Sequence, residues 1–310
     1  MVNATTWAYL LASTALASAF VVNNRDIASS SNGISVCGTA SNTSTLVQPS
    51  AVQRRTKITL RQSETGNSTE LLPIDVYMQI LSADGTEEGG DISDTTIEAQ
   101  LRILDDAFRP VGFRFALKET IRTVNAEWYY NLKIATPYEN QVSLALRKGG
   151  NDTLNIYMMG GLGTSTQAWA SLPSDLQWRP LYDGVFQNGT VFLGGSDPNF
   201  RQGGTLIHEV GHWFGLYHTF ANGCEKSYDY VADTPIEDQP LGLGGCEIGR
   251  DSCPDQPGLD SIHNYMSYSD DECRNSWTPG QIQRMREQMA KFRGVVHPSI
   301  DVDDIPEDTL

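Results

Sequence analysis

The feature that most constrains this chain is a cluster of histidines in a 310-residue sequence that contains only 5 of them. The segment from Thr205 to His218 reads TLIHEVGHWFGLYH and includes His208, His212 and His218. Because His208 and His212 are four positions apart, their side chains lie on one face of a helix, one turn apart. Two imidazoles in that position can bind one zinc ion, and Glu209 can reach a water molecule beside the metal.

Gly215 and His218 extend this pattern. Gly215 suits the left-handed conformation that ends a helix, and the turn after it brings His218 in from a new direction as a third nitrogen ligand. With 5 His and 28 Gly in 310 residues, adding these two positions cuts chance coincidence by roughly 700-fold. Three protein ligands leave a fourth position open for water, as in catalytic zinc sites. A pair of structural histidines is the alternative.

Charge and hydropathy narrow the classes of partner. The chain has 22 basic and 38 acidic side chains and a net charge of -16. Such a surface repels phosphate backbones, which disfavours nucleic acid as a partner. Beyond the N-terminal stretch, no apolar run approaches the ~20 residues that a membrane span requires. Proteins or peptides, and cations such as calcium, suit this balance better.

The N-terminus has the pattern of a secretion signal. Residues 7–20 read WAYLLASTALASAF, and Ala17-Ser18-Ala19 fits the small-x-small cleavage pattern. No Lys or Arg precedes the apolar stretch, which departs from that pattern, and an N-terminal helix packed on a core is the alternative. We expect a signal peptide at residues 1–19 and therefore a secreted, extracellular protein.

Two further features are consistent with secretion. Four triplets match the acceptor pattern for N-linked glycans, at Asn42, Asn67, Asn151 and Asn188. Four of the 5 cysteines lie close together near the C-terminal end, at Cys224, Cys246, Cys253 and Cys273. An even cluster in a secreted chain predicts two disulfides, with three possible pairings. A zinc site of four thiolates is less consistent, because no C-x2-C pair is present.

The segment after the signal differs from the rest of the chain. Ser, Thr and Asn dominate from Ala28 to Ser50, and residues 1–61 carry more basic than acidic side chains. We interpret residues 20–61 as a pro-segment that docks on an acidic globular part, or as a flexible linker. The last ten residues contain acids and no base. Residues 294–310 are therefore expected to form an acidic, disordered tail.

Residues 62–293 are expected to form one catalytic domain with a mixed α/β (α+β) fold. A helix capped by Ser93 or Asp94 should end before Pro110. Alternating or short apolar runs predict the strands, and periodic runs predict the later helices. The expected strands cover residues 72–81, 111–117, 154–159 and 190–193, and the expected helices contain Phe108, His208 and residues 280–292. After Gly215 the chain is rich in loops and stapled by cysteine.

Downstream motifs make a resemblance specific. His208 to Phe220 reads HEVGHWFGLYHTF, residues 229–235 read DYVADTP, and residues 264–268 read NYMSY before Cys273. The extended histidine motif followed by a methionine turn is the metzincin signature. The chain resembles the pappalysin family, and within it the small secreted branch of cytophagalysin-like and fungal extracellular metalloproteases. The resemblance is strongest from about Asp183 to Arg293. It is weaker but recognisable in the part of the chain that runs from Ile74 to Asp183.

The resemblance implies a metzincin-like zinc protease fold, with a twisted sheet, an active-site helix and a loop-rich, disulfide-stapled C-terminal subdomain. It implies roles for six side chains of this sequence. His208, His212 and His218 would bind zinc, and Glu209 would be the general base. Met266 would form an apolar floor below the metal, and Tyr268 could donate a hydrogen bond to the oxyanion. A packed surface tyrosine is the alternative for Tyr268.

The resemblance also implies the disulfides Cys224–Cys253 and Cys246–Cys273. In the segment from Asp229 to Glu237 it implies a calcium site, with Asp229, Val231 and Thr234 as ligands. Oxygen ligands on a loop suit calcium, although a solvated acidic loop would have the same composition.

The resulting interpretation is a secreted, monomeric zinc-dependent endopeptidase that hydrolyses protein or peptide substrates by activating water. A catalytically silent secreted binding module on the same fold is the alternative, and a structural zinc domain is a further one. Substrate is expected to pair with an edge strand, for which residues 154–159 are the candidate.

Two hypotheses go beyond the motif. Cys37, followed by Gly38, could occupy the open zinc position and hold the precursor silent until cleavage near Arg54, Arg55 or Arg61. After the methionine turn, the acidic residues 270–272 could favour a basic side chain on the substrate just after the scissile bond.

Overall fold

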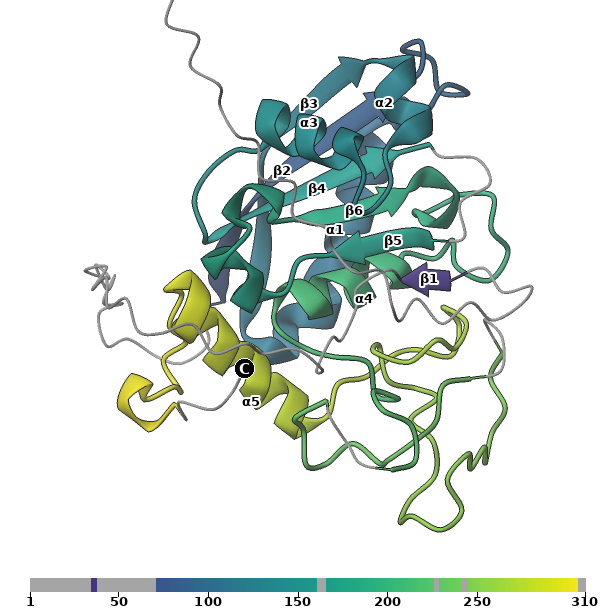
Figure 1. The fold of residues 1–310 in the computed structure, drawn as a ribbon, viewed down its shortest axis with the longest axis vertical. Coiled ribbons are helices and arrows are strands. Elements are labelled where there is room, and N and C mark those ends of the chain that lie inside the picture. The colour runs from purple at the N-terminus through teal and green to yellow at the C-terminus, as the bar shows by residue number, and fades with distance from the viewer. Residues whose placement is uncertain (1–34, 38–70, 161–165, 226–228, 241–244, 306–310) are drawn as a thin grey trace, which may run out of the picture. The chain divides into compact units, whose positions relative to one another are not determined.

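The computed structural model describes residues 35–37, 71–160, 166–225, 229–240 and 245–305 (Figure 1). The expected signal peptide at residues 1–19 and most of the segment 20–61 lie outside these ranges. Within the described ranges, no helix is both long enough and apolar enough to cross a membrane.

The described residues form a mixed α/β structure. The strands are β1 (Ser35–Cys37), β2 (Leu72–Ser82), β3 (Phe113–Val124), β4 (Thr153–Met159), β5 (Thr166–Ala170) and β6 (Val185–Asn188). The α-helices are α1 (Asp94–Phe108), α2 (Ala126–Asn131), α3 (Pro137–Leu146), α4 (Gly204–Trp213) and α5 (Pro279–Gln288). The expectation of a mixed fold with an active-site helix and a loop-rich C-terminal part is confirmed.

The strands form one sheet in the order β1-β5-β6-β4-β2-β3. Strands β2, β3, β4 and β6 are parallel, β5 runs antiparallel to β6, and β1 runs parallel to β5. Strand β4 is paired on both sides and all its residues are buried. The expectation that residues 154–159 form an edge strand is therefore wrong, because β2 and β6 pair with β4 on its two sides. At the opposite edge of the sheet from β3, β5 lies between β6 and the short strand β1.

Side-chain alternation divides the core between the two faces of the sheet. Ile74, Val76, Met78 and Ile80 of β2 face the larger cluster, together with apolar residues of α1 and α4. The opposite face packs against α2 and α3 through a smaller cluster that includes Tyr157 and Trp169. Figure 1 shows α2 and α3 over one side of the sheet, with α1 and α4 on the other. Helix α4 thus lies under the β5–β6 part of the sheet.

Local signals account for two of the element boundaries. Helix α1 begins after Ser93, whose hydroxyl accepts a hydrogen bond from Thr96 N at 3.2 Å, as the capping pattern predicts. The expected strand at residues 190–193 is absent. There Asn188 Oδ1 accepts from Thr190 N at 3.0 Å and turns the chain into a short 3-10 helix, Gly189–Val191. The strand of this region is β6, which precedes that turn.

The chain beyond α5 stays packed on the domain. A π-helical turn, Met289–Arg293, follows α5, and Arg293 forms a buried ion pair with Asp183 at 2.9 Å. Val295 packs against the larger core and Ile300 is buried. The expectation of disorder does not fit the stretch from Val295 to Ile300, because these apolar side chains pack on the domain and do not lie in solvent.

Candidate active site

Helix α4 buries the first part of the histidine motif. His208, Glu209 and His212 are each at most 1% exposed. The helix ends at Trp213, and two residues later Gly215 has a φ of +101°, a left-handed value. Gly215 N donates to His212 O at 2.8 Å, and a Cβ at position 215 would lie 2.5 Å from Gln288 Cγ. Glycine is therefore required here both by its backbone conformation and by the close approach of α5, and the turn directs His218 back toward α4.

The three histidines converge on one point. The Nε2 atoms of His208, His212 and His218 lie 3.2 Å from one another in all three pairs. The backbone carbonyl of Tyr265 lies 2.7 Å from His208 Nδ1, and that of Leu216 lies 2.7 Å from His212 Nδ1. Because a carbonyl can only accept, both Nδ1 atoms carry the proton. Their Nε2 atoms therefore face each other as lone pairs, an arrangement that needs a cation between them.

The residues fit zinc. Burial lowers the pKa of His212 to about 4 and lowers the pKa values of His208 and His218 well below the usual range. All three rings are therefore neutral at neutral pH, the form that binds metal. A tetrahedral ion with Zn–N bonds of ~2.0–2.1 Å would separate two nitrogens by about 3.3–3.4 Å, close to the observed spacing.

The methionine turn lies against the helix. Asn264 Oδ1 accepts from Met266 N at 2.9 Å, and Asn264 exchanges two hydrogen bonds with Gln281 of α5. Met266 is fully buried, and its Sδ would lie 2.6 Å from a Cβ at Gly211. The thioether thus packs on α4 at the glycine next to His212. Sequence reasoning did not assign Asn264 or Gln281 a role, although Asn264 belongs to the quoted motif.

Two aromatic residues border the histidines. The Tyr268 ring centroid lies 5.0 Å from that of His218, and the side chain is buried. Phe220 stacks on His218 with centroids 4.7 Å apart and rings inclined by 9°, and its centroid is also 4.7 Å from that of Tyr268. The packed surface position weighed for Tyr268 does not fit this burial. Phe220 was missed, because nothing in its spacing marks it as a neighbour of the metal ligands.

Cys37 of β1 reaches the same point from the edge of the sheet. It pairs with Ala168 of β5 in the parallel register. Its Sγ lies 3.5 Å from Glu209 Oε2, and its carbonyl oxygen accepts from Tyr268 Oη at 3.2 Å. The Sγ and a ring nitrogen of each histidine all lie within 4.8 Å of one another. Four residues with metal-binding side chains thus gather at this site.

The C-terminal loops contain both disulfides that the family resemblance implies. These are Cys224–Cys253 and Cys246–Cys273.

The expected calcium segment forms a compact group of oxygens. Asp229 is buried, and its Oδ1 accepts from Val231 N at 3.1 Å. Thr234 Oγ1 lies 2.5 Å from Asp229 Oδ2 and 2.9 Å from Val231 O. Since a hydroxyl has one proton, it can donate to only one of these two oxygens.

The acidic residues 270–272 after the methionine turn are not all exposed to solvent. Asp271 is buried and accepts backbone hydrogen bonds from Gln202 N and Gly204 N, at 2.8 and 3.2 Å. Asp271 is therefore engaged by the protein itself, which makes it a poor partner for a substrate side chain.

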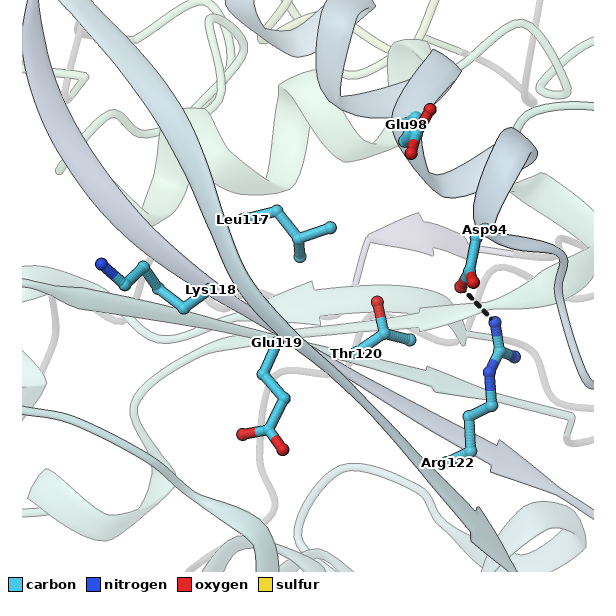
Figure 2. A pocket seen from close by; sticks show the side chains of 7 residues that line it. All are labelled: Asp94, Glu98, Leu117, Lys118, Glu119, Thr120 and Arg122. Atoms are coloured by element: carbon cyan, nitrogen blue, oxygen red, sulfur yellow. Dashed lines mark hydrogen bonds and ion pairs between the residues drawn. The ribbon is translucent and has the colours of Figure 1, made fainter.

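A separate polar pocket lies between α1 and β3 (Figure 2). Its lining includes Asp94, Glu98, Lys118, Glu119 and Arg122, and none of the histidine-site residues. Arg122 donates to Asp94 at 2.6 Å, the contact dashed in Figure 2. Asp94 and Arg122 thus neutralise each other in this pocket, and we assign it no role.

Comparisons with known proteins agree on a family. Residues 151–290 match the peptidase family M43, described as pregnancy-associated plasma protein-A. An extracellular metalloprotease of Pyricularia oryzae is 40% identical over 260 residues, which cover 83% of this chain and 89% of that protein. An extracellular metalloprotease of Podospora anserina is 40% identical over 230 residues, covering 73% and 76% of the two chains.

Solved structures share the fold. Mature mirolysin of Tannerella forsythia, in complex with a cleaved peptide, has a TM-score of 0.61 at 23% identity and covers 71% of this chain and 92% of its own. The promirolysin mutant E225A of that organism has a TM-score of 0.59 at 24% identity, covering 72% and 82% of the two chains. The family match and the sequence relatives show that the chain belongs to the pappalysin (M43) family of metalloproteases.

Proposed function

We propose that this protein is a secreted zinc endopeptidase that acts on protein or peptide substrates as a monomer. Its catalytic centre is formed by His208, His212 and His218 with Glu209. The observation that carries this proposal is the convergence of three histidine Nε2 atoms at 3.2 Å, two of them with Nδ1 held by a carbonyl.

The chain supplies the acid–base chemistry. Zinc, when bound, polarises the scissile carbonyl and lowers the pKa of water toward ~7. Glu209 takes a proton from the attacking water as its oxygen bonds to the carbonyl carbon, then gives that proton to the leaving amine as the C–N bond breaks. Tyr268 donates a hydrogen bond to the carbonyl oxygen as negative charge develops there. Strand β5 offers its backbone to an extended substrate, since β1 already pairs with it in this way.

The alternative is a binding module that has kept the fold without the reaction. The family match and the named metalloprotease relatives favour the enzyme. The test measures casein hydrolysis by processed protein, with and without a zinc chelator. Glu209→Gln should lower the rate by about 10²–10⁴-fold while zinc stays bound. Glu119→Gln, at an exposed position of β3, should leave the rate unchanged. Equal inertness of the wild-type and Glu209→Gln proteins would support the binding module.

We further infer that the Cys37 segment keeps the precursor latent. Its thiol lies beside Glu209 and the histidines, and its carbonyl engages the Tyr268 hydroxyl. A thiol near zinc is readily deprotonated and is a strong ligand, so Cys37 would take the place of the attacking water. Proteolysis between Cys37 and β2, for which Arg54, Arg55 and Arg61 are the candidates, would then release the segment.

We also propose that Asp229, Val231 and Thr234 bind calcium. The close approach of Thr234 Oγ1 to both Asp229 Oδ2 and Val231 O supports this, because one hydroxyl proton serves only one of the two contacts. A hard cation bound by all three oxygens would remove the repulsion.

A further inference from the structure

Helix α4 begins without a cap of its own. Its N-cap residue is Gly203, with a φ of +93° and no side chain to accept from the first turn. The carboxylate of Asp271 supplies the missing acceptor. Its Oδ2 accepts from Gln202 N at 2.8 Å and from Gly204 N at 3.2 Å. The cap therefore comes from the segment that follows the methionine turn.

A buried arginine holds this carboxylate in place. Arg274 Nη2 donates to Asp271 Oδ1 at 2.5 Å, and the two side chains are 0% and 1% exposed. Arg274 Nη1 also lies 3.4 Å from the carbonyl of Ser267, next to Tyr268. The guanidinium balances the carboxylate, and the negative charge lies at the positive end of the helix dipole. Asp271 thus contacts the start of α4, Arg274 contacts the methionine turn at Ser267, and their ion pair links the two contacts.

The helix start is shaped to fit this contact. A Cβ at Gly204 would lie 2.3 Å from Asp271 Oδ1, and one at Gly203 would lie 2.7 Å from Gln100 Nε2. Glycine at position 204 is therefore required by the approach of the carboxylate. Position 204 is one helical turn before His208, so displacement of the helix start would move His208 and Glu209 relative to Tyr268.

We propose that Asp271 is a positioning residue of the zinc site, acting on His208 and Glu209 through the start of α4. The proposal rests on the proposed function. His208 is then held from the methionine-turn segment twice, by the Tyr265 carbonyl on its Nδ1 and by Asp271 on its helix. This role removes Asp271 from the hypothesis that the acidic residues 270–272 recognise a basic substrate side chain.

The test compares Asp271→Ala and Asp271→Asn with Ser93→Ala in the processed, zinc-loaded enzyme. Ser93→Ala removes the N-cap of α1, away from the site. It is the control for the effect of losing a helix cap as such. We expect Asp271→Ala to lower kcat by about 10- to 100-fold with KM within about twofold. Zinc transfer to a colorimetric chelator should accelerate about tenfold. Asp271→Asn keeps one acceptor oxygen, so its kcat and its rate of zinc release should lie between those of the wild type and Asp271→Ala. Ser93→Ala should lower only the melting temperature.

Gly204→Ala approaches the same contact from the helix side, and keeps the test decisive if Asp271→Ala fails to fold. Its Cβ would displace the carboxylate, so the same changes in kcat and zinc release are expected. Unchanged kcat and zinc release in Asp271→Asn and Gly204→Ala would overturn the proposal. Asp271 would then be only a structural cap of α4. Loss of a preference for basic substrates alone would overturn it in favour of a substrate pocket. Zinc release needs no hydrolysis, so this readout survives failure of the proposed function.

Discussion

At the scale of single residues, the site depends on where protons sit. Two backbone carbonyls fix the Nδ1 protons of His208 and His212, which turns both Nε2 lone pairs toward one point. The sequence predicted which side chains would meet, because the spacing of four and the glycine turn are local features. It could not predict which carbonyls orient them, since Tyr265 lies 57 positions from His208.

Cys37 yields a prediction at this scale. The unprocessed chain with Cys37→Ala should hydrolyse peptide or process itself, whereas the wild-type precursor should be latent, because the thiol lies beside Glu209 and the histidines. Cys37→Ser, which keeps the size but offers a poorer zinc ligand, should show intermediate latency. Hydrolysis of a quenched fluorescent peptide by freshly purified precursors measures this. Equal latency in all three would mean that the segment blocks the cleft by bulk.

His297 yields a pH prediction. Burial, with a smaller effect of Arg286, lowers its pKa from 6.5 to about 4. The unfolded chain therefore binds more protons between these values, so this residue's contribution to stability is complete above pH 6.5 and falls toward pH 4. His297→Gln should flatten the fall of unfolding free energy across that window. Urea unfolding of both proteins from pH 4 to 8 measures the difference, and a difference constant over this range would contradict it.

At the scale of elements, the sequence predicted single helices and strands well and the pairing between strands poorly. Helix α1, with its Ser93 cap, and strand β2 follow from local periodicity and capping. Strand β5 was missed because its five residues have no distinctive alternation and it is defined by its partners β1 and β6. The central place of β4 likewise depends on a crossover that no local pattern encodes.

The turn after α4 yields a matched pair of glycine variants. Gly215→Ala should lose about 1–2 kcal/mol of stability from its left-handed backbone and more from the clash with Gln288, and zinc content should fall because His218 moves. Gly194 has a φ of +77° with no atom within 4 Å of a Cβ, so Gly194→Ala should show the backbone cost alone. Denaturant unfolding and zinc analysis check both. Equal losses would show that the contact with α5 is dispensable.

Two turns differ in their capacity to carry a glycan. Asn151 is exposed in the turn between α3 and β4. Asn188 ends β6, is 5% exposed and uses its side-chain oxygen to cap the next turn. Glycopeptide mass spectrometry of secreted protein should find an N-linked glycan at Asn151 and none at Asn188. Loss of one glycan mass should follow Asn151→Gln but not Asn188→Gln, and a glycan at Asn188 in active protein would refute the distinction.

At the scale of the whole molecule, the loop-rich segment between α4 and α5 holds Met266, Tyr268 and Asp271, and its described residues form no helix or strand. Its order comes from disulfides, capped turns and buried ion pairs, such as that of Arg250 with Glu237 at 3.0 Å. The cysteine count and the family resemblance indicated the disulfides. The ion pairs were not predictable, because a charged residue in a loop carries no local sign of burial.

Calcium should stabilise this loop-rich segment. A calcium concentration about 100 times the Kd should add ~2.7 kcal/mol and raise the melting temperature by roughly 5–10 °C. Asp229→Asn should abolish that rise, whereas Asp238→Asn, on an exposed neighbour, should not. Calorimetry of the zinc-loaded protein with and without calcium measures it. A melting temperature independent of calcium would leave residues 229–237 as a hydrogen-bonded loop only.

The two disulfides overlap along the chain, since Cys246 lies between Cys224 and Cys253, and Cys253 lies between Cys246 and Cys273. Every peptide bond from residue 224 to residue 273 is therefore bridged by at least one covalent link. A protease can cleave other copies of itself, and proteolytic cleavage falls mainly in exposed loops. A single self-inflicted cut in this region would leave the methionine turn covalently attached to the zinc helix, so the enzyme can be nicked without being divided.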